Sequence, residues 1–174
     1  IALADALLAE RSLPIPERVA TLVLRARAYE LTGDLERSIV DLEGALALDV
    51  GQARVWNELG LVSADAGRVE RAIAAFERAV QVDPRFARGW NNLGNALRGT
   101  GRIAEAIRAV ERATVADPAY ALAWANLGAL RREGGDDTGA ESALTSALAL
   151  APDHVGALMT LGGLLRDRSD LANA

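Results

Sequence analysis

A repeat of 34 residues constrains the fold of this chain more than any other feature of its sequence. Between Arg85 and Pro118, a tryptophan, a Leu-Gly pair and several alanines stand at fixed offsets. The same pattern recurs 34 residues earlier and 34 residues later without an insertion. A period of about 20 to 50 residues is typical of solenoids and other arrays. We therefore predict a linear array of similar units rather than one globular core.

Three units show the pattern most completely, at positions 4, 7, 8, 15, 20, 24, 27 and 32 when Ala53, Ala87 and Ala121 are taken as position 1. The matching residues are Trp56, Leu59, Gly60, Gly67, Ala72, Phe76, Ala79 and Pro84, then Trp90, Leu93, Gly94, Gly101, Ala106, Val110, Ala113 and Pro118, then Trp124, Leu127, Gly128, Gly135, Ala140, Leu144, Ala147 and Pro152. Small residues let two helices approach closely, and the large residues fill the space between them. The glycine at position 15 predicts a turn with positive φ, and the proline predicts the end of the second helix.

The pattern resembles the tetratricopeptide repeat family, whose signature places Trp, Leu-Gly, Ala, Phe, Ala and Pro at these positions. The resemblance extends over essentially the whole chain. It implies an all-α fold of tandem helix-turn-helix repeats that form a right-handed superhelical solenoid. In each repeat, helix A (about positions 2–14) would line the concave groove, and helix B (about positions 16–30) would form much of the outer wall.

The period divides the chain into a single array. The predicted boundaries are residues 1–18 for the second half of a preceding repeat, 19–52, 53–86, 87–120 and 121–154 for repeats 1 to 4, and 155–174 for the start of repeat 5. Repeat 1 is degenerate, because Arg25 replaces the leucine of position 7 and Ser38 replaces the alanine of position 20. The first residue is Ile1, and Ala174 falls inside a predicted helix, so we expect the chain to be a fragment of a longer polypeptide.

Composition excludes several kinds of function. The formal net charge of −5 argues against a general binder of nucleic acid. Apolar runs are too short for a membrane helix, so no membrane insertion is predicted. The absence of cysteine excludes a disulfide, a thiolate metal site and a cysteine nucleophile. Together with the lack of a visible targeting segment, it favours a cytoplasmic location.

No motif for catalysis, a metal or a cofactor is found. The single histidine, His154, falls in a predicted link between helices and has no second histidine or cysteine as a co-ligand. The acidic turn at 134–139 lacks the ligand spacing of a calcium loop and coincides with a predicted helix stop and cap. The tryptophans at position 4 are interpreted as core. We therefore expect this chain to have no enzymatic activity of its own and to need no cofactor.

Polar residues gather at helix A positions 2, 5, 6, 9, 12 and 13, which should face the groove. The candidate peptide-binding residues are Arg54, Asn57, Arg88, Asn91, Asn92, Asn95, Arg98, Asn126, Arg132 and Arg166. The asparagines at position 6, Asn92 and Asn126, are similar to the asparagine ladder in the repeat domain of O-linked N-acetylglucosamine transferase. An amide offers both a donor and an acceptor to a peptide backbone. The alternative is that asparagine is simply a common polar choice at this position.

The arginines at position 12, Arg98, Arg132 and Arg166, predict a basic column that would attract an acidic peptide. The alternative is that each complements the dipole at the end of its helix. The first hypothesis for function is a non-enzymatic scaffold that binds a protein or an extended, acidic peptide in the groove. The second is a substrate-docking or regulatory domain of a larger, glycosyltransferase-like enzyme. A third is homo-oligomerisation through the apolar flanks of the end helices.

Overall fold

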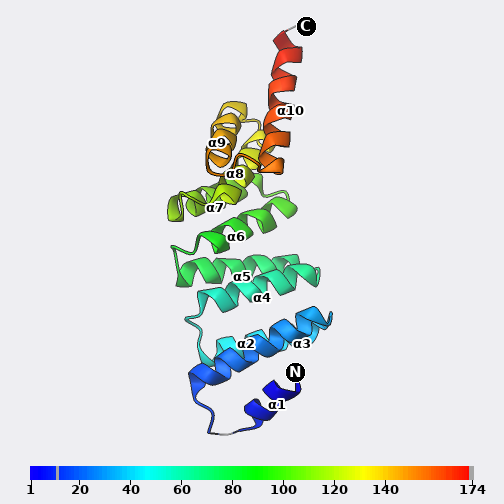
Figure 1. The fold of residues 1–174 in the computed structure, drawn as a ribbon, viewed down its shortest axis with the longest axis vertical. Helices are drawn as coiled ribbons and strands as arrows, with labels where there is room; N and C mark the ends of the chain where they lie inside the picture. The colour runs from blue at the N-terminus through cyan, green and yellow to red at the C-terminus, as the bar shows by residue number, and fades with distance from the viewer. Residues whose placement is uncertain (11, 173–174) are drawn as a thin grey trace. The chain divides into compact units, whose positions relative to one another are not determined.

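The predicted all-α architecture is confirmed. The computed structural model describes residues 1–10 and 12–172, which form ten α-helices and no strand (Figure 1). Contacts within the chain define two compact units, Ile1–Pro84 and Arg85–Ala174. Each unit is built from antiparallel helix pairs, and successive pairs pack side by side within it.

The first unit contains five helices. They are α1 (Ala2–Ala9), α2 (Ile15–Leu31), α3 (Leu35–Leu48), α4 (Ala53–Asp65) and α5 (Val69–Val82). The pairs α2–α3 and α4–α5 are helices A and B of repeats 1 and 2, and α1 is a lone helix B that packs against α2. Helix α2 begins four residues before the predicted start of repeat 1, because Pro16 lies in its first turn, where a missing N–H costs nothing.

The second unit contains the other five helices. They are α6 (Ala87–Gly99), α7 (Ile103–Ala116), α8 (Ala121–Glu133), α9 (Asp137–Leu150) and α10 (Val155–Ala172). The pairs α6–α7 and α8–α9 are repeats 3 and 4, and α10 is helix A of repeat 5, packed against both α8 and α9.

Glycine at position 15 makes the turn between helices A and B. Gly33, Gly67, Gly101 and Gly135 have φ values of 80°, 73°, 75° and 84°. In each turn the next amide donates to the carbonyl of position 11, as Arg68 N does to Ser63 O at 2.8 Å. A Cβ at these glycines would meet nothing within 4 Å, so the requirement is one of backbone conformation rather than space.

Repeat 5 departs from the prediction at this position. It has Ser169 in place of glycine, and α10 continues as an α-helix to Ala172 instead of turning after position 13. A serine adopts the left-handed conformation poorly, whereas it is tolerated inside a helix. The predicted turn is therefore wrong for this repeat, and α10 has 18 residues where α4, α6 and α8 have 13.

Glycine at position 8 lets the two helices of a repeat meet. A Cβ on Gly60, Gly94 or Gly128 would lie less than 3 Å from the side chain at position 24 of the same repeat, which is Phe76, Val110 or Leu144. These three side chains are buried. The close approach explains why the sequence keeps a glycine at this point of the core.

The tryptophans are half-buried, and Trp56 and Trp124 pack against clusters of buried core residues, in agreement with the predicted core role. Trp56 Nε1 donates to Val50 O at 2.9 Å, and Trp124 Nε1 donates to Pro118 O at 2.9 Å. The guanidinium of Arg78 lies 5.6 Å from the centre of the Trp56 ring. The guanidinium of Arg112 lies over the Trp90 ring in the same way, at 5.7 Å from its centre.

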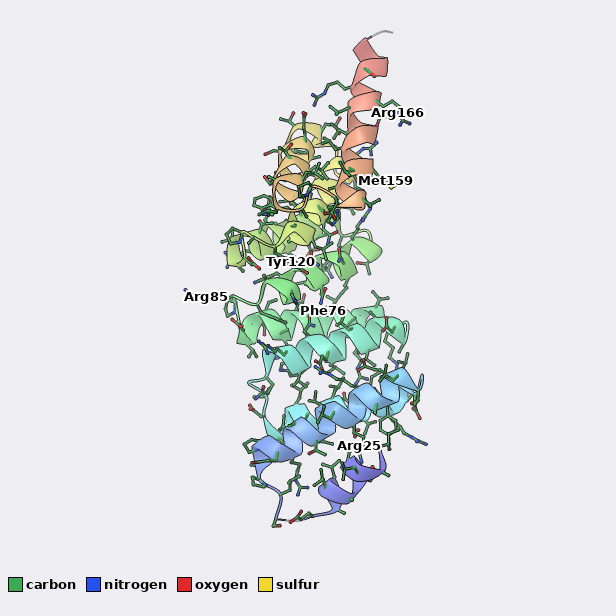
Figure 2. All side chains as sticks on the ribbon, viewed as in Figure 1. Arg25, Phe76, Arg85, Tyr120, Met159 and Arg166 are labelled. Carbon is green, nitrogen blue, oxygen red and sulfur yellow. The ribbon has the colours of Figure 1, made fainter. Side chains whose placement is uncertain are left out.

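An ion pair explains the degeneracy of repeat 1. Arg25 Nε and Nη2 donate to the two carboxylate oxygens of Asp41 at 2.7 and 2.6 Å, and Nη1 donates to Asp5 of α1 at 2.6 Å (Figure 2). Asp41 is buried and stands at position 23, where repeats 2 to 4 have alanine. The hydrogen bond that Arg25 donates to Asp41 is the main cause that raises the pKa of Arg25. Repeat 1 thus replaces an apolar contact between positions 7 and 23 with a bidentate ion pair.

Candidate peptide-binding surface

A cavity of about 560 Å³ opens between helices α2 and α4 of the first unit. Its lining is mainly apolar and comes from the A helices of repeats 1 and 2 and the turns before them. The lining residues are Ile15, Pro16, Val19, Ala20, Val23, Leu24, Arg27, Asp49, Gln52, Arg54, Val55 and Glu58. Its size is within the usual range for small ligand sites, and it can hold one or two side chains of a peptide.

The polar part of this cavity consists of Arg27, Arg54 and Glu58. Arg27 forms an ion pair with Glu58, and this hydrogen bond is the main cause that raises the pKa of Arg27. The other oxygen of Glu58, Oε2, is buried without a hydrogen-bond partner in the described part of the chain. Arg54 is exposed and forms no ion pair within residues 1–10 and 12–172. The cavity therefore combines an apolar wall with a cation that is available to a ligand.

Acidic groups surround the end of α2. Burial is the main cause that raises the pKa of Glu30, although Ser38 Oγ donates to its carboxylate at 3.1 Å. The nearby charges of Glu58 and Asp65 raise this pKa further, and Arg27 lowers it. The first unit thus holds three carboxylates near a single neutralising arginine, an arrangement that the sequence did not predict.

The candidate asparagines divide into buried and accessible residues. Asn57 is 8% exposed and Asn91 is 1% exposed, so neither offers much surface to a ligand. Asn126 Nδ2 donates to Asn91 Oδ1 at 2.8 Å and joins repeat 4 to repeat 3. The half-buried Asn126 retains its carbonyl oxygen and a second N–H. The predicted set therefore serves partly to connect neighbouring repeats.

The arginines at position 12 also connect repeats. Arg98 Nε lies 2.6 Å from Glu133, and Arg132 Nη2 lies 2.6 Å from Asp167. Both carboxylates stand at position 13 of the following repeat. Arg166, which Figure 2 labels on α10, is exposed and forms no ion pair with the described residues. Two of the three predicted cations are thus already neutralised in the folded chain.

The remaining candidates lie on α6. Arg88 and Asn95 are exposed, whereas Asn92 is half-buried and engaged in an interaction within the protein. Burial raises the pKa of the Tyr120 hydroxyl, and the charge of Arg88 opposes this shift. Arg88 and Asn95, together with Arg166 of α10, therefore keep the most accessible polar groups of the predicted surface in the second unit.

The other sequence motifs have structural roles. His154 Nδ1 accepts from Ala157 N at 3.1 Å and so caps the start of α10. Asp136, in the acidic turn, accepts from Gly139 N at 2.9 Å and caps α9, as predicted. Within the described residues, no group of three or more His, Cys, Asp or Glu could hold a metal, and no helix is long and apolar enough to cross a membrane.

Tandem helix pairs with glycine-mediated contacts define a helical repeat protein. The sequence matches a family model described as Tetratricopeptide repeat over residues 41–88, 57–121 and 91–153, which together span more than half of the chain. The chain belongs to the tetratricopeptide repeat family. No match to a curated protein was found.

Solved structures share this fold. The crystal structure of MamA superposes with a TM-score of 0.77 at 23% identity, covering 83% of this chain and 84% of MamA. YrrB, described as a TPR protein with an unusual peptide-binding site, has a TM-score of 0.70 at 22% identity, covering 81% and 73%. PilF of Pseudomonas aeruginosa has a TM-score of 0.79 at 22% identity, covering 90% and 71%. At this level of identity the likeness extends to the fold.

Proposed function

We propose that this chain is a protein-interaction scaffold that binds an extended peptide on the surface formed by its A helices. The observation behind this proposal is the cavity between α2 and α4, whose wall is apolar and whose edge includes the exposed cation Arg54. An apolar side chain of the peptide would enter the cavity beside Leu24 and Val23. An acidic group next to it in the peptide would meet Arg54.

The lining residues come from two neighbouring A helices rather than from one enclosed pocket, which favours a peptide over a small metabolite. In the second unit, taken by itself, Arg88, Asn92, Asn95 and Asn126 are the residues that we propose for contacts with the main chain of a ligand. The buried asparagines Asn57 and Asn91 are left out of this role.

The test is binding of a peptide library to the wild type and to single variants at two salt concentrations. Leu24→Gln should weaken peptides with an apolar anchor by about 5- to 30-fold, which corresponds to about 1–2 kcal/mol of lost apolar burial. Arg54→Gln should slow association of acidic peptides, and its effect should shrink at high salt.

Val40→Gln is the matched control, because Val40 and Leu24 are both 64% exposed but Val40 lies on α3. If Val40→Gln weakens binding as much as Leu24→Gln does, the cavity is not the binding site. The alternative of a substrate-docking domain in a larger enzyme would use the same surface. Assaying the natural full-length polypeptide for turnover distinguishes the two.

A further inference from the structure

In the second unit, ion pairs connect the ends of neighbouring A helices at one fixed step of the repeat. Arg98, at position 12 of repeat 3, donates to Glu133, at position 13 of repeat 4, at 2.6 Å. Arg132 and Asp167 form the same contact between repeats 4 and 5, also at 2.6 Å. A carboxylate at position 13 is therefore placed to bind a guanidinium that lies beside position 12 of the repeat before it.

The first unit has two carboxylates at this step. Glu30 stands at position 12 of repeat 1, and Asp65 stands at position 13 of repeat 2. Glu30 accepts from Ser38 Oγ at 3.1 Å, whereas Asp65 is exposed and forms no ion pair in the described part of the chain. After burial, which is the largest cause, the negative charges of Glu58 and Asp65 raise the pKa of Glu30, so these carboxylates repel one another. Neither position supplies the cation that the second unit has here.

Both charges are unfavourable for the fold itself. Glu30 lies in the last turn of α2, and Asp65 is the last residue of α4. The C-terminus of a helix carries a partial negative charge, which favours basic residues and opposes acidic ones. Helices α6 and α8 have arginine in the last turn, whereas α2 and α4 have no basic residue there. Residues that break a local rule in this way are expected at functional sites.

One stripe of α4 joins this carboxylate pair to the cavity. Arg54, Glu58, Leu61 and Asp65 follow at intervals of four, three and four residues, so they lie on the same face of the helix. Arg54 and Glu58 line the cavity. Leu61, one turn before Asp65, is 44% exposed and can pack on the aliphatic stem of a long basic side chain. The surface thus continues from the cavity to an apolar contact and then to a carboxylate.

We propose that Glu30 and Asp65 bind the guanidinium of an arginine in the peptide whose apolar anchor enters the cavity, an inference that rests on the proposed function. Leu24 of the cavity and Glu30 are six residues apart on α2, or about 9 Å. An extended peptide advances about 3.3 Å per residue, so the arginine lies about three residues from the anchor. Arg54 lies at the other end of the A helices, so the acidic residue of the peptide lies on the opposite side of the anchor. The order of charges therefore fixes the direction of the peptide.

A guanidinium fits this place better than a metal ion. Among the residues that the structure describes, no group of three or more His, Cys, Asp or Glu could hold a metal. A planar guanidinium carries five N–H donors and has no acceptor, so it can donate to carboxylates on two neighbouring helices at once. The occupant is therefore an organic cation of the kind that Glu133 and Asp167 already bind within the chain.

The test is binding of short labelled peptides in which one leucine, with an aspartate beside it, stands among glycines and serines. A single arginine is moved along the peptide on either side of the leucine. Arginine about three residues from the leucine, on the side away from the aspartate, should tighten binding about 3- to 5-fold over the arginine-free peptide. The same residue on the other side should give no gain, because it would lie near Arg54. High salt should reduce the gain.

Three variants separate this contact from the cavity. Asp65→Asn should remove the gain from arginine and leave binding of the arginine-free peptide unchanged, since Asp65 does not line the cavity. Glu77→Gln removes the same charge from an exposed position on α5, so it is the matched control and should keep the gain. Glu30→Arg supplies the arginine that repeats 3 and 4 have at position 12. It should pair with Asp65, stabilise the protein and abolish the gain.

Two results would overturn the inference and leave the cavity as the binding site. One is a gain that does not depend on the place of the arginine in the peptide. The other is an equal loss of the gain in Asp65→Asn and Glu77→Gln, which indicates attraction to the acidic chain as a whole. If no peptide of the series binds, the proposed function fails together with this inference.

Discussion

The same substitution at the same repeat position should have opposite effects in repeats 3 and 5. Replacing glycine by alanine inside a helix contributes about 1 kcal/mol of stability through helix propensity. At Gly162 nothing opposes this gain, because a Cβ there meets no atom within 4 Å. We therefore expect Gly162→Ala to increase the free energy of unfolding by up to about 1 kcal/mol.

At Gly94 the new methyl group has no space. It would lie less than 3 Å from Val110 Cγ2 and 3.1 Å from the backbone oxygen of Ala106. Val110 is fully buried, and its branched side chain has little rotamer freedom. Overpacking of this kind costs about 1–3 kcal/mol. After subtraction of the propensity gain, Gly94→Ala should destabilise the protein by up to about 2 kcal/mol.

The assay is urea denaturation followed by circular dichroism, at concentrations where the chain is monomeric. Because a repeat array need not unfold in one step, the curves should be fitted with coupled repeats rather than a two-state model. Fluorescence of Trp90, in the same repeat as Gly94, gives a local check. If Gly94→Ala stabilises the protein, or if the two variants shift the denaturation curves equally, the close approach of α6 and α7 is not the reason why a glycine stands at position 94.

Three further predictions concern the first unit. Arg25→Leu should cost about 3–5 kcal/mol by leaving Asp41 buried and unpaired, whereas the double variant with Asp41→Ala should recover most of that loss in a double-mutant denaturation cycle. Glu30→Gln should stabilise the protein at pH 7, as measured by denaturation across pH. Because the pKa of Glu30 is raised in the folded protein, the contribution of Glu30 to the free energy of unfolding is fully present below the unfolded pKa of about 4.3 and is lost as pH rises through the folded pKa. The variant should therefore have little effect on stability near pH 3. In hydrogen exchange on dilute protein, the amides of α1 should exchange before those of α3, because α1 has no buried residue; equal protection would contradict this.

The repeated positions made the fold predictable from sequence. Glycine at position 15 and small residues at positions 8 and 20 each restrict the backbone strongly, and they recur in register. Their effect is local, so a pattern of single residues is enough to locate the helices. The continuation of α10 beyond position 14 was missed because the prediction followed the period. It did not take into account that Ser169 stands where the other repeats have the glycine of the turn.

The surface was less predictable, because it depends on which side chains neutralise one another. Arg98 and Arg132 were identified as a basic column, but the acidic partners at position 13 come from the following repeat. The cavity beside α2 was missed because its wall is made of apolar residues, such as Val23 and Leu24, that have no distinctive pattern. A search for apolar residues at groove positions 5 and 6 could have found it.

The ion pair between Arg25 and Asp41 has a consequence for folding fidelity. Repeats with nearly identical core residues can exchange helices, since α5 would fit the glycine of repeat 3 much as it fits its own. Exchange of helix α3 is disfavoured, because a foreign helix B would place an alanine such as Ala75 against Arg25 and leave this partly buried cation with only the exposed carboxylate of Asp5. The charged pair therefore favours α3 over the other B helices as the partner of α2.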